Sequence, residues 1–141
     1  MAESAIPPAT RQAFVETAYH VFAPARFALR IGERSEALDA LQRAHGVAAS
    51  AFVTACNPCS QDLGAAANAP RMAALRAELR VAGVPFLDGE GVHPSNGWPP
   101  EPSLLALGLS RDAARALGER HGQDAIVWCG ADAVPQIELL R

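Results

Sequence analysis

The most constraining part of this chain is residues 50–60, Ser-Ala-Phe-Val-Thr-Ala-Cys-Asn-Pro-Cys-Ser, where a short apolar run leads directly into polar turn residues. An apolar run of this length that ends at turn residues is typical of a buried strand. The Asn57-Pro58 pair forces the chain to turn where the strand ends. Thr54, Cys56 and Asn57 are therefore predicted to lie at the C-terminal end of a buried strand, where α/β sheets commonly bind ligands.

Helices and strands alternate along the rest of the sequence. Apolar spacing and capping residues predict helices over about 10–19, from Ser35 to Gly46, from Asn68 to Gly83 and from Ser110 to Gly122. Strands are predicted at 21–22 paired with 27–31, and at 50–55, 84–87, 103–109, 125–129 and 137–140. This order predicts a disordered lead over residues 1–8 and a single α/β or α+β domain over 9–141. The domain is expected to have a mixed sheet of about five to six strands with three to four helices packed on it.

The intervening residues 88–102 hold several Gly and Pro and are predicted to form one long loop. Loops of this length in compact domains are commonly functional. Trp98 is expected at the tip of this loop.

The composition excludes several classes of function. Of the 141 residues, 50% are hydrophobic and 19% are charged, which is typical of a soluble globular protein. A net charge of −3 offers no basic surface for nucleic acid, and no window approaches the ~18 apolar residues of a membrane span. No cofactor-binding motif is present, so no cofactor is predicted. Three cysteines without a signal peptide favour a reducing cytoplasm.

Cys56 and Cys59 form a C-x-x-C pattern that has three interpretations. A redox pair places its first cysteine at a helix N-terminus, yet Gly64 and the predicted helix start at Asn68 leave no room for a long helix. A metal site could add Cys129, His93 or His121, but zinc sites usually show a second close pair of ligands. The favoured interpretation is two small side chains at a turn, with redox and metal chemistry as alternatives.

Other polar side chains stand beside predicted apolar elements. Arg71, in the first turn of a helix capped by Asn68, opposes the helix dipole and is expected to have an anionic partner, either Glu101 or a ligand. Glu101 lies between two prolines at the start of a core strand and is the one candidate for a general acid or base. Each of these residues also has a structural explanation, as a cap, a solvated carboxylate or an ion pair.

These segments together resemble a bacterial family of proteins of unknown function, the domain numbered 3293 (DUF3293). The family pattern reads here as Tyr19, Thr54-Ala-Cys-Asn-Pro58, Asn68 with Arg71, Glu101-Pro-Ser103 and Gly122-Gln-Asp-Ala125, over residues about 16–140. Cys56 stands where the family has an aromatic residue, and Cys59 where it has a longer polar one, so the C-x-x-C is peculiar to this chain. The resemblance implies that polar groups from separate segments meet at one end of the sheet, but it supplies no activity.

The sequence therefore predicts a cytoplasmic protein with one polar pocket at the C-terminal edges of its strands. The pocket residues are Thr54, Asn57, Asn68, Arg71, Glu101, Ser103 and Gln123. The predicted ligand is a small polar or anionic metabolite, with Arg71 supplying charge and the three amide side chains orienting the ligand.

A non-enzymatic protein-interaction module, with Trp98 on its partner surface, is one alternative. A thiol-redox or metal site at Cys56 and Cys59 is another. Whether the protein is an enzyme, and its oligomeric state, stay open at this point.

Overall fold

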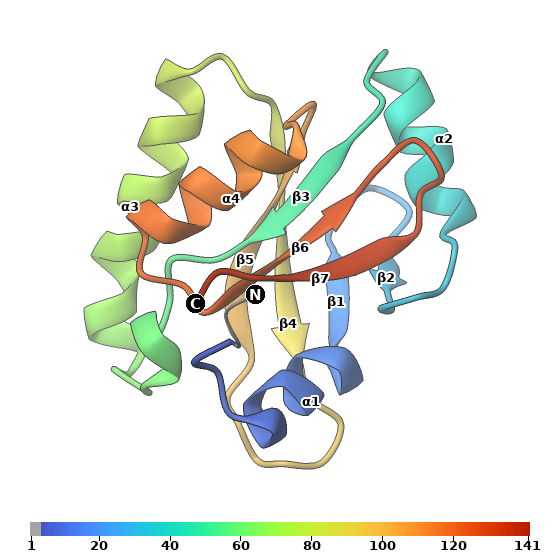
Figure 1. Ribbon diagram of the computed structural model, residues 1–141. Coiled ribbons are helices and arrows are strands. Elements are labelled where there is room, and N and C mark those ends of the chain that lie inside the picture. Colours follow the sequence, from blue (N-terminus) through green and yellow to red (C-terminus); the bar gives the residue numbers. More distant parts are fainter. Residues whose placement is uncertain (1–3) are drawn as a thin grey trace.

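The computed structural model describes residues 4–141, which form one α+β domain around a single curled sheet (Figure 1). The strands are β1 (Ala18–Val21), β2 (Phe27–Leu29), β3 (Ser50–Val53), β4 (Phe86–Val92), β5 (Glu101–Leu107), β6 (Ala125–Cys129) and β7 (Pro135–Leu139). The helices are α1 (Pro8–Glu16), α2 (Glu36–Ala44), α3 (Ala65–Val81) and α4 (Arg111–Arg120), with a short 3₁₀ turn η1 (Pro58–Ser60).

The strand order is β2-β1-β4-β5-β3-β6-β7, and every pairing is antiparallel. The predicted fold class is confirmed in its α+β form. The sheet has seven strands, slightly more than expected, and it lacks the parallel pairs of a mixed sheet. The reason is that three of the connections, β1–β2, β4–β5 and β6–β7, join neighbouring strands as hairpins, which are antiparallel by geometry.

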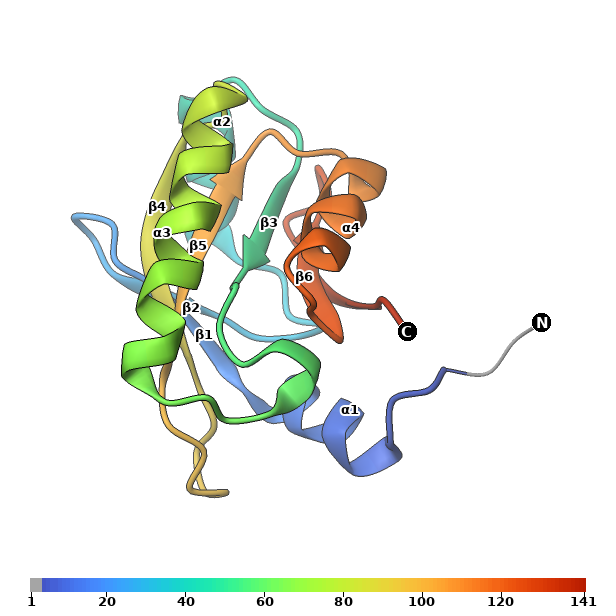
Figure 2. The same cartoon turned by 90° about the vertical axis from the view of Figure 1, so that its left-hand side faces the viewer.

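Helices cover both faces of the sheet. α3 and α4 lie next to each other over one face, and α2 packs on the other (Figure 2). Alternate residues of β3 separate the two cores, since Ala51 and Val53 face α3 and α4 while Phe52 faces the opposite side. Residues along β3 are buried on both faces, which explains why this strand is uniformly apolar in the sequence.

The curl of the sheet closes one end of the face that α2 covers. The chain between β2 and α2 is hydrogen-bonded to the start of β7, from Gly32 N to Pro135 O at 2.9 Å and from Ser35 N to Ala133 O at 2.9 Å. At the opposite end of this face, α1 crosses the sheet (Figure 1). The side chains of α1 are at most half-buried, so this helix covers the sheet without filling the space beneath it.

The two serine-capped helices are confirmed. Ser35 Oγ accepts a hydrogen bond from Leu38 N, and Ser110 Oγ accepts one from Ala113 N, each at 3.1 Å. The predicted first hairpin is also confirmed, since Val21 pairs with Phe27 in the β1–β2 ladder.

Three predicted boundaries are wrong. The first helix ends at Glu16, before Tyr19, because residues 18–21 form a strand paired with both β2 and β4. β4 continues to Val92, through the residues expected to begin the long loop, because Gly89 and Gly91 pair with β1. The third helix begins at Ala65, before Asn68, since a run of three alanines, the best helix formers, precedes Asn68.

The expected disordered lead, residues 1–8, lies partly outside the described residues. Of residues 4–8, Ile6 is buried and Pro8 is the first residue of α1. Over residues 4–141, no helix combines the length and the apolar character that crossing a membrane requires.

The β1–β4 pairing predicts that substitutions of two glycines in β4, Gly89 and Gly91, differ strongly in their effect on stability. A Cβ added at Gly89 would lie 2.2 Å from the backbone oxygen of His20, whereas one added at Gly91 would meet its nearest atom at 3.5 Å. We expect Gly89→Ala to lower the free energy of unfolding by about 2 kcal/mol, because strand separation must increase, and Gly91→Ala to change it by less than about 0.5 kcal/mol. Denaturant unfolding of both variants measures this difference. Equal effects at the two positions would contradict the β1–β4 register.

Candidate functional site

A reciprocal pair of amide side chains holds the loop that follows β3. Asn68 Oδ1 accepts a hydrogen bond from Asn57 N at 2.9 Å, and Asn68 Nδ2 donates to Asn57 Oδ1 at 2.7 Å. Asn57 Oδ1 also accepts from Leu63 N at 3.0 Å. Both asparagines are buried, and Asn57 adopts the left-handed conformation, with φ 50° and ψ 57°, which Asn tolerates better than most residues. The amide pair therefore fixes the turn between β3 and α3.

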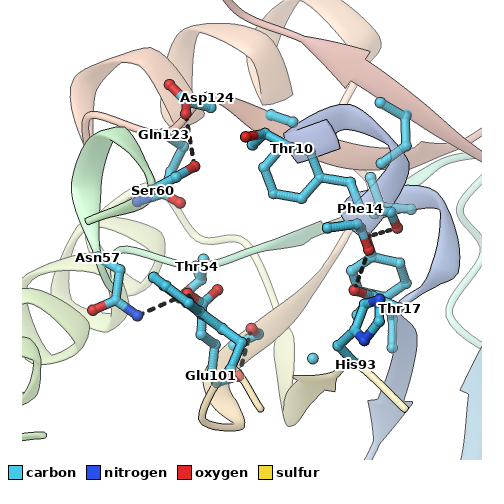
Figure 3. A pocket seen from close by; sticks show the side chains of 18 of the residues that line it. Thr10, Phe14, Thr17, Thr54, Asn57, Ser60, His93, Glu101, Gln123 and Asp124 are labelled. Carbon is cyan, nitrogen blue, oxygen red and sulfur yellow. Dashed lines mark hydrogen bonds between the residues drawn. The ribbon is translucent and has the colours of Figure 1, made fainter. Parts of the chain in front are cut away.

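Asn57 also holds a carboxylate through its side-chain NH2 group. Its Nδ2 donates to Glu101 Oε2 at 2.7 Å (Figure 3). The Trp98 indole Nε1 donates to the same oxygen at 2.9 Å. Glu101 is the first residue of β5 and is followed by Pro102, which restricts the backbone there. Among residues 4–141, no side chain or backbone group donates to Glu101 Oε1. The site thus presents a carboxylate that is fixed through one oxygen and free at the other.

The other predicted pocket residues support the ends of the strands. Thr54 Oγ1 accepts from Cys56 N at 3.0 Å and donates to Pro102 O at 2.7 Å. Ser103 Oγ donates to Glu101 O at 3.0 Å. The bond from Thr54 to Pro102 ties the end of β3 to the start of β5, and the other two hold the backbone on either side of it.

Gln123 connects the same loop to the segment before β6. Its Nε2 donates to Cys56 O at 3.0 Å and to His121 O at 3.1 Å. Within the described residues, the Gln123 amide oxygen accepts no hydrogen bond, so it is a free acceptor on the wall of the cavity described below.

The polar groups meet for a different reason from the one predicted. β3 runs antiparallel to both β5 and β6, so the C-terminal end of β3 lies beside the N-terminal ends of its two neighbours. Thr54 and Asn57 follow the end of β3, whereas Glu101 and Gln123 lie at or just before the start of β5 and β6. The expectation that all of them lie at strand C-termini is therefore wrong.

Two of the predicted pocket residues lie outside the cavity. Asn68 supports Asn57 from α3, as described above, and does not cap the helix. Arg71 is exposed on α3, and no ion pair or hydrogen bond involves its side chain within the described residues. The partner expected for Arg71 depended on a first-turn position, but α3 begins six residues before Arg71, beyond the reach of the N-terminal dipole.

A cavity of about 320 Å³ lies between α1, the curled sheet and the loops around Glu101. We call it the α1 cavity. Five of the seven predicted pocket residues line it, namely Thr54, Asn57, Glu101, Ser103 and Gln123. Its apolar and aromatic walls come from distant parts of the chain and include Ala9, Ala13, Phe14, Tyr19, Phe52, Trp98, Val127 and Ile137. Figure 3 shows Phe14 and Thr10 of α1 across the cavity from Asn57 and Glu101.

Tyr19 links α1 to the sheet beneath it. Its hydroxyl donates to Phe14 O at 2.5 Å, and its ring packs edge to face on Phe52 with the centroids 5.2 Å apart. Burial, with a smaller contribution from the negative charge of Glu101, raises the pKa of Tyr19 well above its usual range. The phenol therefore stays neutral and serves as a hydrogen-bond donor that positions α1.

His93 links α1 to the loop that carries Trp98. Its Nδ1 accepts hydrogen bonds from Ser95 N at 3.1 Å and Asn96 N at 3.0 Å, which places the ring proton on Nε2. Nε2 then donates to Glu16 Oε1 at 3.1 Å, and this hydrogen bond lowers the pKa of Glu16. Asn96 Oδ1 in turn accepts from Trp98 N at 2.9 Å. The loop is thus ordered around His93, and α1 is fastened to it.

Sequence reasoning missed the contributions of α1, His93 and Asp124. Asp124 accepts from Ser60 Oγ at 2.7 Å and pairs with Arg141 at 2.6 Å, on the side of the cavity next to Gln123. The one sequence signal for any of these three was that Asp124 directly follows Gln123, which is a predicted pocket residue. Nothing in the amphipathicity of α1 indicated that this helix covers a polar site.

The cysteines do not form a typical redox pair. Cys56 is buried, with Sγ 3.5 Å from Pro102 O, and burial raises its pKa rather than lowering it. Cys59 is exposed and lies in a single 3₁₀ turn, so no helix dipole acts on either thiol. Burial also raises the pKa of Cys129, to about 12. Over residues 4–141, no group of three or more His, Cys, Asp or Glu side chains is placed to hold a metal ion.

The fold and the site define an α+β domain with an open, largely apolar cavity and a fixed carboxylate. Residues 53–126 match a family described as a protein of unknown function, DUF3293, over just over half of the chain. The chain belongs to this family, as its sequence motifs indicated. The matched region holds Glu101, Trp98 and both asparagines, whereas α1, β1 and β7 lie outside it. No curated protein and no solved structure matches the chain.

The amide pair predicts that two nearby substitutions on α3 differ strongly in their effect on stability. Asn68→Ala leaves the buried Asn57 N without a hydrogen-bond partner and removes one of the two donors to Asn57 Oδ1, so it should lower the free energy of unfolding by about 2–3 kcal/mol. Arg71→Ala removes an exposed side chain and should change it by no more than about 0.5 kcal/mol. Denaturant unfolding compares the two variants. A loss of stability in Arg71→Ala as large as that in Asn68→Ala would contradict this assignment.

The exposure of the thiols predicts their reactivity. In the native protein, a colorimetric thiol reagent should modify Cys59 rapidly and leave Cys56 and Cys129 unmodified until the protein unfolds. Cys59→Ser should abolish the rapid phase, and a chelator should leave the kinetics unchanged. Rapid reaction at Cys56, or an effect of the chelator, would instead support thiol or metal chemistry at the C-x-x-C.

Proposed function

We propose that this protein binds a small molecule in the α1 cavity and recognises it through the Glu101 carboxylate. The cavity volume, about 320 Å³, falls at the lower end of the roughly 300–1,000 Å³ of small-molecule sites. Such sites typically have mostly apolar walls with a few fixed polar groups, and the α1 cavity has this character. A compact metabolite or a side group of a larger one fits this volume.

The observation that carries the proposal is the way Glu101 is held. Two neutral donors, Asn57 and Trp98, fix Oε2, and Asn57 is itself fixed by Asn68. Within residues 4–141 no protein group donates to the second oxygen, so Oε1 is available to a ligand. A preorganised group of this kind loses little freedom when a ligand binds, and this favours affinity.

The charge of the cavity changes the predicted ligand class. Within residues 4–141, no arginine lines the α1 cavity, and Arg71 lies on the exposed side of α3. We therefore retain the small polar metabolite of the sequence prediction and give up its anionic form. If a bound molecule is also a substrate, Glu101 is the group placed to accept or donate a proton.

Trp98 bears on the alternative of a protein-interaction module. The residue is 36% exposed, but its indole N–H is bonded to Glu101 and its backbone N–H to Asn96. These bonds favour a role as a wall of the cavity over a role as a partner surface. We also propose a cytoplasmic location, because the three cysteines are free thiols.

Binding can be tested without knowing the natural ligand. A fragment library of small amines, alcohols, amides and carboxylates should include compounds that shift the Trp98 indole N–H resonance in ¹H–¹⁵N NMR spectra. Ala13→Leu places a larger side chain in the cavity and should weaken such binding by about tenfold or more.

The matched control is Ala74→Leu, the same substitution at an exposed position of α3. It should bind fragments as the wild type does. If no fragment shifts resonances of the cavity residues, or if Ala13→Leu binds as the wild type does, the proposed function is wrong.

A further inference from the structure

We propose that the molecule bound in the α1 cavity is an organic cation, held by aromatic side chains and the Glu101 carboxylate. This inference rests on the proposed function and names the chemical class of its ligand. It has two independent supports, the distribution of aromatic residues and the balance of charge around the cavity.

Aromatic residues are concentrated at the cavity. The chain has five Phe, two Trp and one Tyr, and four of these eight line it: Phe14, Tyr19, Phe52 and Trp98. Tyr19 and Phe52 also belong to the core, which alone explains their burial. Phe14 and Trp98 do not, since both are partly exposed, and they come from α1 and from the loop before β5. Aromatic rings attract cations through the negative charge of their faces.

The charge balance of the walls points in the same direction. Two carboxylates line the cavity, and Asp124 is neutralised by Arg141 at 2.6 Å. Glu101 has only neutral hydrogen-bond donors, and none of the twelve arginines among residues 4–141 reaches the cavity wall. The cavity therefore contains one carboxylate without a counter-ion.

The same arrangement disfavours the other ligand classes. An anion would meet the charge of Glu101 with no compensating cation. A neutral alcohol could bond to Oε1 but would leave the carboxylate charge uncompensated once water is displaced from the largely apolar walls. A metal ion needs several ligands, and among the described residues no group of three or more His, Cys, Asp or Glu side chains is placed to hold one. An organic ammonium ion satisfies both the aromatic walls and the carboxylate.

The test uses ligands that differ only in charge. Choline is compared with the neutral alcohol in which a carbon atom replaces its nitrogen, and pentylammonium is compared with pentanol. Each is titrated into ¹⁵N-labelled full-length protein by NMR. The chain has two indole N–H resonances, and Trp98 reports on the cavity while Trp128, bonded to Leu109 O at 3.1 Å, serves as the internal reference.

We expect the Trp98 resonance to shift with at least one of the cations, with an affinity about tenfold higher than for its neutral partner. Glu101→Gln keeps the side-chain shape and should remove most of this preference. Glu33→Gln, at an exposed carboxylate away from the cavity, should leave it intact. If Glu101→Gln does not fold, Phe14→Leu provides a second variant. It should weaken cation binding more than neutral binding, with Phe22→Leu as the aromatic control outside the cavity.

The outcomes separate this inference from the proposed function. If the neutral compounds bind as tightly as the cations and compete with fragments for the cavity, the inference is wrong and the proposed function stands. If anionic fragments bind in the cavity and the cations do not, the inference is likewise wrong and the proposed function stands. If no compound of any charge shifts the Trp98 resonance, both fail.

Discussion

The hydrogen-bonded pair of Asn57 and Asn68 is the interaction on which the rest of the site depends. It joins the left-handed turn after β3 to the first part of α3 and leaves the side-chain NH2 group of Asn57 to donate to Glu101. Asn68 of α3 therefore positions Asn57, Asn57 positions Glu101, and Glu101 in turn positions the Trp98 indole. Each member is neutral except the carboxylate, so the network fixes Glu101 without neutralising its charge.

The curled sheet explains why a cavity exists here at all. One end of the inner face is closed by hydrogen bonds between the chain after β2 and the start of β7, and it is filled by the core beneath α2. The other end is covered by α1, whose side chains are at most half-buried. Two polar contacts hold α1, one through Tyr19 and one through Glu16 with His93. Such a helix can cover a cavity and still allow a ligand to enter, because few buried apolar contacts oppose its movement.

The two serine caps are predicted correctly by the local sequence, whereas the start of α3 and the contacts of Asn68 are not. Ser35 and Ser110 cap their helices as predicted, because a cap depends on the next three residues. Asn68 looks like a cap, but its amide is bonded to a loop eleven residues earlier, and the helix begins before it. Arg71 was assigned a ligand on the basis of that wrong boundary. The meeting of Asn57 with Glu101 was implied by the family motif, whereas the cover provided by α1 depends on contacts that no local pattern encodes.

The most direct test of the network is an acid titration followed by NMR. As Glu101 gains a proton, the Trp98 indole N–H and the Asn57 side-chain amide resonances should shift together on the titration curve of the Glu101 carboxyl carbon, because both donate to its Oε2. The Trp128 indole, which donates to a backbone oxygen, should not follow this curve. If Trp98 and Asn57 shift independently of each other, or do not respond to Glu101, the carboxylate is not held as described and the account of the site is wrong.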